Sequence, residues 1–351
     1  MTEPPDGSRP THKRRPRYPG THPRRFEERY KELDAENYPS IVPHVLAKGR
    51  TPAGQHVPIM VQEILDALAP APGERAVDAT LGYGGHAERL LERLAPGGHL
   101  LGLDADPIEL PRTEARLRKL GHDESALTAK RTNFAGLHAA IAAAGWTNGA
   151  DLVLADLGLS SMQIDNPARG FTYGAPGPLD MRMNPNRGIS AADWLAKSDA
   201  KRLALALHEN ADEPFADLLA EAIMAKAGTL HSTEALTSVV RSALLEHATA
   251  DEADKSVRRV FQAIRIAVND ELHSLDALLR DLPYCLKPGG RVAILAFHSG
   301  EDRRVKHAFV AGERAGLYSA IAPDVIRASP AERFDNPRSR PAKLRWARRA
   351  K

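Results

Sequence analysis

The sequence predicts an α/β protein in which a mostly parallel sheet is interrupted by an all-helical insertion. Between residues 76 and 158, short apolar runs alternate with segments of helical periodicity, as in sheets covered by helices on both faces. From about residue 165 to residue 250 only the helical periodicity continues, and the alternation returns after residue 260. An insertion within one α/β domain explains this order better than two tandem domains.

The elements follow in order along the chain. HVPIMVQEILDAL (56–68) is amphipathic and predicts the first helix of the folded body. Strands are expected at AVDAT (76–80), HLLGLD (99–104), ALTAKR (126–131) and DLVLADLG (151–158). The helices between them are expected at GHAERLLERL (85–94), PIELPRTEARLRKLG (107–121) and FAGLHAAIAAAG (134–145). One apolar stripe over residues 260–282 predicts a further helix, which a KPGG turn separates from the strand RVAILAF (291–297).

This pattern divides the chain into three parts. Residues 1–50 are rich in Pro and charge and show little periodicity, so we expect a basic, largely extended arm. Residues 51–164 and 251–351 are expected to form the α/β domain. Residues 165–250 are expected to form the helical insertion, with a role in substrate recognition.

Composition restricts the class of protein. Apolar residues make up 42% and charged residues 26% of the chain, as in ordinary globular proteins. No apolar run is long enough to span a bilayer, and no secretory signal is evident, so no membrane contact is expected. The one cysteine, Cys285, excludes an internal disulfide and a multi-cysteine zinc site, and fits a cytoplasmic protein. The histidines lack metal-ligand spacing, so no metal is expected.

The net charge of +3 conceals an asymmetry. Residues 1–50 carry 11 Lys and Arg against 7 Asp and Glu, and residues 327–351 carry 9 against 2, so the remaining body is acidic. Basic ends on an acidic body favour contact with a polyanion. For the tails alone, basic residues that only maintain solubility are an equally good explanation.

A nucleotide-binding loop is predicted after the first strand. GYGGHA (82–87) fits the loose pattern G-x-G-x-x-A, and Asp104 ends the next strand, where it can accept hydrogen bonds from a ribose. These features suit NAD as well as S-adenosyl-L-methionine. Asp78 would repel a pyrophosphate but suits a cationic amine and sulfonium, and Asp156 ends the fourth strand, where reacting groups gather. Methyl transfer is therefore favoured.

With these residues the chain resembles the bacterial small-subunit ribosomal RNA methyltransferase H family. The resemblance covers nearly all of residues 56–345, and its most specific motifs are DLGLSS, PLDMRM and FHSGED. It implies a Rossmann-like class I methyltransferase with a helical insertion, S-adenosyl-L-methionine as cofactor, and small-subunit ribosomal RNA or the ribosomal subunit as partner. The implied product is one cytosine of the decoding region methylated at its exocyclic N4 amine. No oligomeric state is indicated.

The resemblance also implies the cofactor site. It assigns the methionine end of the cofactor to Gly84, Gly85 and His86, and the ribose to Asp104. It places Phe134 beside the adenine, and Asp156 and Gln163 complete the set.

The chemistry of the cytosine amine assigns a role to Asp156. The amine is a poor nucleophile, so alignment and polarisation matter more than a strong base. We hypothesise that Asp156 accepts an N–H of the amine or positions the donor. Cys285 lies beside the KPGG turn, where a buried structural thiol is expected. This disfavours methylation at carbon, which needs a thiolate, and leaves nitrogen or oxygen.

Two segments are candidates for the substrate side. RGFTYGAPGPLDMRMN (169–184) combines aromatic and guanidinium groups on a loop, which suits stacking on a base turned out of its stack and contact with its phosphates. Its candidate residues are Arg169, Phe171, Asp180 and Arg182, with a core role for Phe171 equally well supported. FHSGEDRR (297–304) places His298 and Ser299 at the substrate mouth, although a helix cap also explains Ser299.

Departures from the family pattern leave a shifted RNA target open. DEADKSVRR (251–259) replaces a His-Pro-Ala-x-Arg run, HSGED replaces HSLED, and residues 1–50 lie outside the family core. Two other classes of function also remain: a non-catalytic RNA-binding assembly factor that keeps the fold, and an NAD-dependent oxidoreductase.

Overall fold

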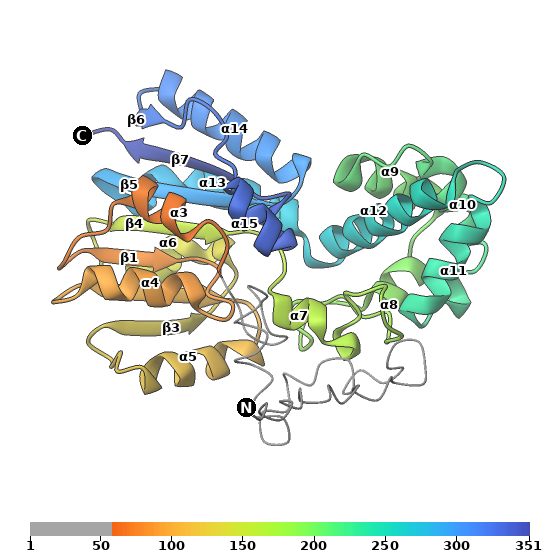
Figure 1. The fold of residues 1–351 in the computed structure, drawn as a ribbon, viewed down its shortest axis with the longest axis horizontal. Helices are drawn as coiled ribbons and strands as arrows, with labels where there is room; N and C mark the ends of the chain where they lie inside the picture. Colours follow the sequence, from red (N-terminus) through yellow and green to blue (C-terminus); the bar gives the residue numbers. More distant parts are fainter. Residues whose placement is uncertain (1–57) are drawn as a thin grey trace, which may run out of the picture.

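The computed structural model describes residues 58–351 (Figure 1). The expected arm over residues 1–50 and the expected start of the first helix at His56 lie outside the described residues. Within residues 58–351, no helix is long and apolar enough to cross a bilayer.

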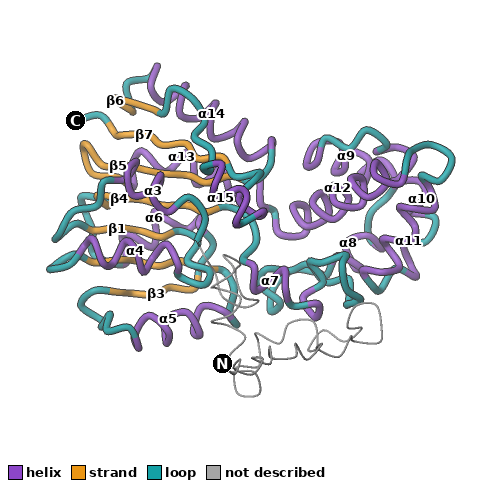
Figure 2. The backbone as a smooth tube through the Cα atoms, viewed as in Figure 1, coloured by secondary structure: helices purple, strands orange, loops and turns teal. Residues whose placement is uncertain are grey.

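A seven-stranded sheet forms the centre of the molecule (Figures 1 and 2). Its strands are β1 (Arg75–Asp78), β2 (His99–Asp104), β3 (Leu127–Arg131), β4 (Ala150–Asp156), β5 (Leu286–Ala296), β6 (Tyr318–Ile321) and β7 (Lys343–Arg349). The spatial order is β3-β2-β1-β4-β5-β7-β6. Strands β1 to β5 run parallel, and β7 is antiparallel to both of its neighbours. The predicted α/β fold class is confirmed.

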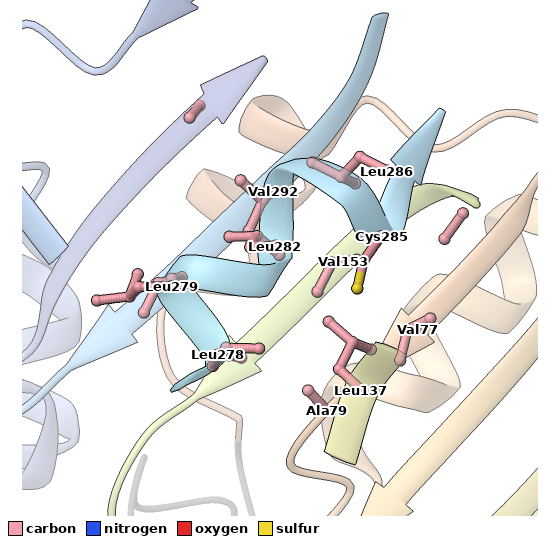
Figure 3. Packing of buried hydrophobic residues seen from close by; sticks show 14 of the residues in the cluster. Val77, Ala79, Leu137, Val153, Leu278, Leu279, Leu282, Cys285, Leu286 and Val292 are labelled. Carbon is pink, nitrogen blue, oxygen red and sulfur yellow. The ribbon is translucent and has the colours of Figure 1, made fainter. Parts of the chain in front are cut away.

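Helices cover both faces of the sheet, because each carries one apolar stripe that packs on it. One face holds α3 (Val61–Leu68), α4 (Gly85–Leu94) and α5 (Glu109–Lys119). The other face holds α6 (Leu137–Ala143), α13 (Glu271–Cys285) and α14 (Ser299–Arg314). Figure 3 shows Cys285 in this second layer, among leucines of α13 and valines of the sheet.

The helical part has a hydrophobic core of its own, which lies apart from the two layers on the sheet (Figure 2). After α7 (Ser161–Asp165) and a long loop, it consists of α8 (Ala191–Ala196), α9 (Ala200–Ala211), α10 (Ala216–Met224), α11 (Thr233–Ala243) and α12 (Ala250–Asn269). Its buried residues extend from Phe171 to Ile264. We therefore propose that the insertion continues past residue 250 into α12.

The helix predicted over residues 260–282 is two helices, α12 and α13. The break is at Asp270, whose backbone adopts the left-handed conformation with φ of 51°. The preceding residue, Asn269, fixes this turn through hydrogen bonds to a loop that is distant in the sequence. Its side-chain amide donates to the Met181 carbonyl at 2.7 Å, and its oxygen accepts the Met183 N–H at 2.7 Å. The turn thus depends on a loop far away in the sequence.

The last part of the chain adds elements that the sequence analysis did not predict. They are β6, β7 and, between them, the short helix α15 (Pro330–Asp335) with the 3₁₀ turn η5 (Pro337–Ser339). In Figure 1, α15 lies at the junction between the sheet and the helical insertion.

Candidate functional site

A cleft of about 1470 Å³ lies between the carboxyl edge of the sheet and the helical insertion. The ends of β1, β2 and β4 line it from one side, and residues of α12 and of the loop before α8 line it from the other. Ligand pockets commonly measure about 300–1,000 Å³. The cleft is thus larger than a single small ligand requires.

The glycine loop forms the wall of the cleft next to β1. Gly82 and Gly84 have positive φ angles of 49° and 79°, which glycine adopts without strain. Gly84 donates its N–H to the Leu81 carbonyl at 2.7 Å, and α4 begins at the next residue, Gly85. A side chain at Gly85 would lie 3.1 Å from the Pro58 ring, so glycine allows the two segments to approach. The predicted loop between strand and helix is therefore present.

Three carboxylates surround this loop, one from each of three adjacent strand ends. Asp78 ends β1 and is buried, which raises its pKa to about 6. Asp104 ends β2, and burial raises its pKa as well. Its two oxygens accept the N–H groups of Gly82 and Asp106, at 2.7 and 2.8 Å. Asp156 ends β4, so the predicted acids meet at one edge of the sheet.

His86 connects the glycine loop to Asp156. Its Nε2 lies 2.9 Å from the Ile59 carbonyl oxygen, which can only accept, so this nitrogen carries the hydrogen. Burial lowers the pKa of His86, which favours the neutral ring. The unprotonated Nδ1 therefore faces Asp156 Oδ2 at 3.5 Å.

Asp156 has an unusual environment for an acid. Burial, followed by the charge of Glu301, raises its pKa to about 7. Its backbone N–H donates to Thr80 Oγ1 at 2.6 Å, which fixes the strand end. Its Oδ1 is buried and has no hydrogen-bond partner among residues 58–351. A buried oxygen of this kind is costly unless a ligand supplies the donor.

Gln163 and Phe134 also line the cleft. The Gln163 side chain closes a capping box at α7, where its oxygen accepts the Ser160 N–H. Its amide donates to Asp106 at 2.9 Å. Phe134 begins a 3₁₀ turn, η2 (Phe134–Gly136), and packs against the apolar layer that contains α13.

Asp106 is a residue that the sequence analysis did not single out. Its carboxylate is 1% exposed and accepts the N–H groups of Ile108 and Glu109 at the start of α5. It also accepts from Gln163 and, at 2.8 Å, from Arg169. Asp106 is the second acid of the LGLDADP motif, which could have drawn attention to it. Its side-chain partners come from distant segments, so the sequence alone does not reveal its role.

The predicted substrate residues divide into two groups. Phe171 and His298 line the cleft. Phe171 also belongs to the helical core, so both of its predicted roles agree with its position. His298 caps α14 and lies 3.1 Å from Glu301 Oε1.

The other four candidates, Arg169, Asp180, Arg182 and Ser299, are not among the described residues that line the cleft. The predicted phosphate contact is not supported for Arg169, because Asp106 and two backbone carbonyls occupy its buried guanidinium. Arg182 forms a two-pronged ion pair with Asp180. Ser299 donates to Asp212 at 2.8 Å, in the turn after α9.

A buried ion pair in the cleft wall was also missed. Arg265 of α12 donates to both oxygens of Glu271 of α13, at 2.8 and 2.9 Å. The pair spans the break at Asp270, so its residues do not share a helix and periodicity could not reveal it. Within residues 58–351, no three His, Cys, Asp or Glu side chains are grouped to hold a metal ion.

Comparison with known proteins gives a consistent result. A family model described as the MraW methylase family matches residues 53–350. "Ribosomal RNA small subunit methyltransferase H 1" of Agathobacter rectalis is 48% identical over 345 residues, which cover 97% of this chain and 98% of that protein. "Ribosomal RNA small subunit methyltransferase H 2" of Alkaliphilus metalliredigens is 49% identical over 343 residues, covering 96% and 97%.

A third relative differs in how much of this chain it matches. "Ribosomal RNA small subunit methyltransferase H" of Anaeromyxobacter sp. is 41% identical and covers 83% of this chain and 96% of its own length. The matches to the first two proteins cover 97% and 96% of this chain, so they must include most of residues 1–50. The family model, by contrast, begins at residue 53.

Proposed function

The chain belongs to the MraW methylase family, and on that premise we propose that it methylates the exocyclic N4 amine of one cytosine in the decoding region of small-subunit ribosomal RNA. The methyl donor is S-adenosyl-L-methionine. The names of the relatives support small-subunit ribosomal RNA as the substrate, and a cytoplasmic enzyme would meet that substrate. The choice of base and atom rests on the family resemblance and on the residues of the cleft.

The observation that carries this proposal is the position of Asp156. Asp156 lines the cleft, and its Oδ1 is buried and without a partner among the described residues. An exocyclic amine offers an N–H donor that an oxygen in this position can accept. A carbon acceptor would leave the oxygen unpaired.

The cleft suits a cofactor that carries positive charge. Three carboxylates on adjacent strand ends would repel a pyrophosphate but favour a sulfonium and an amine. When bound, S-adenosyl-L-methionine supplies an electrophilic methyl group. Gly84, Gly85 and His86 would hold its methionine end.

The rest of the cofactor would lie along β2 and β3. Asp104 would accept from the ribose hydroxyls, because the Gly82 and Asp106 N–H groups already fix its orientation. Phe134 would lie against the adenine, and Gln163 would hold the loop that closes this side of the cleft.

The mechanism assigns two tasks to Asp156. The lone pair of the cytosine amine is delocalised into the ring, so an acceptor for its N–H favours the rehybridised, nucleophilic form. Asp156 also fixes the direction of the amine, which an in-line displacement requires. The proton then lies on Asp156, 3.5 Å from the unprotonated Nδ1 of His86.

The single thiol of the chain supports a nitrogen acceptor. Methylation at cytosine C5 requires a thiolate that attacks the ring. Cys285 is fully buried in the apolar layer between α13 and the sheet, and burial raises its pKa to about 12 (Figure 3). It is also absent from the cleft lining formed by residues 58–351. This thiol therefore cannot serve as the nucleophile.

Mass spectrometry of ribosomal RNA tests the proposal. RNA from cells that lack the gene should miss one N4-methyl group on a decoding-region cytosine, and the wild-type gene should restore it. An unchanged cytosine at that position would refute the substrate assignment, and a methyl group missing elsewhere would indicate a shifted target. Failure of the purified protein to bind S-adenosyl-L-methionine would favour a non-catalytic assembly factor.

A further inference from the structure

One aromatic side chain at the mouth of the cleft is almost completely in solvent. Phe334 on α15 is 82% exposed, which is the largest value among the large hydrophobic residues between 58 and 351. It also lines the cleft. Exposure of a single apolar side chain is common, but a fully exposed ring that also lines the cleft is available to a ligand bound there.

The helix that carries Phe334 is held in place by the cofactor site. Glu332 Oε1 accepts the Met60 N–H at 2.8 Å, and the carbonyl of the neighbouring Ile59 accepts from His86. Arg338 donates to Asp165 of α7 at 2.6 Å, which fixes the other end of this segment. Phe334 is thus presented from a fixed position relative to the glycine loop.

Arginines lie near this ring, together with the acids Glu332 and Asp335. Arg333, Arg338 and Arg340 lie within six residues of Phe334 and are exposed. On the facing side of the cleft, α12 contributes the exposed Arg258, and the loop before α8 contributes Tyr173, which is 40% exposed. Aromatic faces with arginines on both sides of a groove are the features that bind single-stranded nucleic acid.

We propose that Phe334 stacks on an unpaired base next to the target nucleotide and so holds the RNA strand across the cleft. The inference rests on the proposed function, which makes the strand ribosomal RNA. A protein partner fits less well. The residues on either side of Phe334 in the chain are mostly charged or polar, which suits a nucleic-acid strand better than the apolar centre of a protein interface.

Substitutions at Phe334 test the stacking. Phe334→Ala should weaken binding to an oligocytidine RNA about 5- to 100-fold, the range for loss of one base–aromatic stack. The KM for small subunits from cells that lack the gene should rise in parallel, while kcat and the affinity for S-adenosyl-L-methionine stay unchanged. Phe334→Trp should keep wild-type binding, and Phe334→Leu should resemble the alanine variant because it lacks an aromatic face.

Leu245→Ala serves as the matched control. Leu245 is 78% exposed, lies in the turn after α11 and does not line the cleft, so its loss should change neither measurement. Thermal unfolding should show that each variant keeps its fold, as expected for exposed positions.

The outcomes separate this inference from the proposed function. Wild-type RNA binding by Phe334→Ala or Phe334→Leu would overturn the stacking role, even if the decoding-region cytosine is the target. Weaker oligocytidine binding by both variants, with the methyl group mapped to another atom, would retain the stacking role and refute the proposed function.

Discussion

Asp156 combines features that are each unfavourable in an isolated protein. Its Oδ1 is buried and lacks a hydrogen-bond donor within the described chain, and both burial and the charge of Glu301 oppose its ionisation. His86 does not relieve the charge, because burial keeps its ring neutral. A cationic ligand would favour the ionised acid, and an amine would supply the missing donor.

Replacement of Asp156 should separate catalysis from folding. Asp156→Asn keeps the size of the side chain but offers the amine a much weaker acceptor, so kcat should fall about 100- to 10,000-fold. Single-turnover methylation of small subunits measures this effect. Ser299→Ala, outside the cleft, should keep near wild-type activity. A near wild-type rate for Asp156→Asn would remove this residue from the mechanism.

The same acid should make cofactor binding depend on pH. A cation beside Asp156 favours the ionised form, so binding below the free-protein pKa requires release of a proton. The affinity for S-adenosyl-L-methionine should therefore fall up to about tenfold for each pH unit below about 7. Asp78, with a pKa raised to about 6, would add to the effect at lower pH.

Calorimetry over pH 5.5 to 8.5 tests this dependence. S-adenosylhomocysteine lacks the sulfonium charge, so its affinity should change less with pH. Asp156→Asn should flatten the dependence above pH 6. A steep dependence that persists in this variant would assign the titration to Asp78 or His86.

At the scale of elements, the local patterns predicted β1 to β4 and their helices to within a few residues. Strands β1, β2 and β4 are short apolar runs bounded by turn residues, and such patterns need no distant partner. Strand β7 was missed because arginines alternate with its apolar residues in a basic tail. The break at Asp270 was missed because the apolar stripe continues on both sides and the cause, Asn269, acts through residues 181–183.

In the candidate site, too, local patterns were predicted and pairings between distant residues were not. The glycine loop and the acids at the ends of β1, β2 and β4 follow from strand-end geometry, so the sequence alone located them. The partner of Arg169 is Asp106, 63 residues away, and no local pattern reveals that pairing. An arginine on a loop therefore looked like a phosphate ligand although it is a buried structural residue.

Loss of the Asp106 carboxylate should loosen the connection between β2 and the loop that follows α7. Asp106→Asn leaves Arg169 buried without its counter-charge, so the free energy of unfolding should fall by about 3–5 kcal/mol. Urea denaturation measures the change. The same substitution at Asp254, whose pair with Arg241 is half exposed, should cost about 1 kcal/mol or less. If both substitutions lower the free energy of unfolding equally, the buried pair of Asp106 and Arg169 contributes no more to stability than an exposed pair.

At the scale of the whole molecule, the cleft lies between two separate cores, so each contributes one wall. The sheet supplies the glycine loop and the acids Asp104 and Asp156, and the helical insertion supplies Arg258 and Phe171. The acidic wall suits a cationic methyl donor, whereas the arginines suit the phosphates of RNA. The acids at the strand ends and the arginines at the mouth thus suit two substrates of opposite charge in different parts of one cleft.

The basic residues of the segment 1–50 are a further candidate for contact with RNA phosphates. Seven basic residues and no acid lie between Ser8 and Arg25, and the first described residue, Pro58, lines the cleft. Deletion of residues 1–50 should weaken binding to small subunits and reduce the slope of log K against log salt, by about 0.7–0.9 for each phosphate that the arm neutralises in the wild-type complex. Cofactor affinity should not change.

A full-length variant separates charge from chain length. Replacement of the seven basic residues between Ser8 and Arg25 by Gln should reproduce most of the reduced salt slope, because the slope depends on the number of released counterions and not on the buried area. Filter binding over a range of salt concentrations measures it. If both variants keep the wild-type slope, the arm binds no phosphates and its charge serves solubility, so the arginines at the cleft carry the RNA affinity alone.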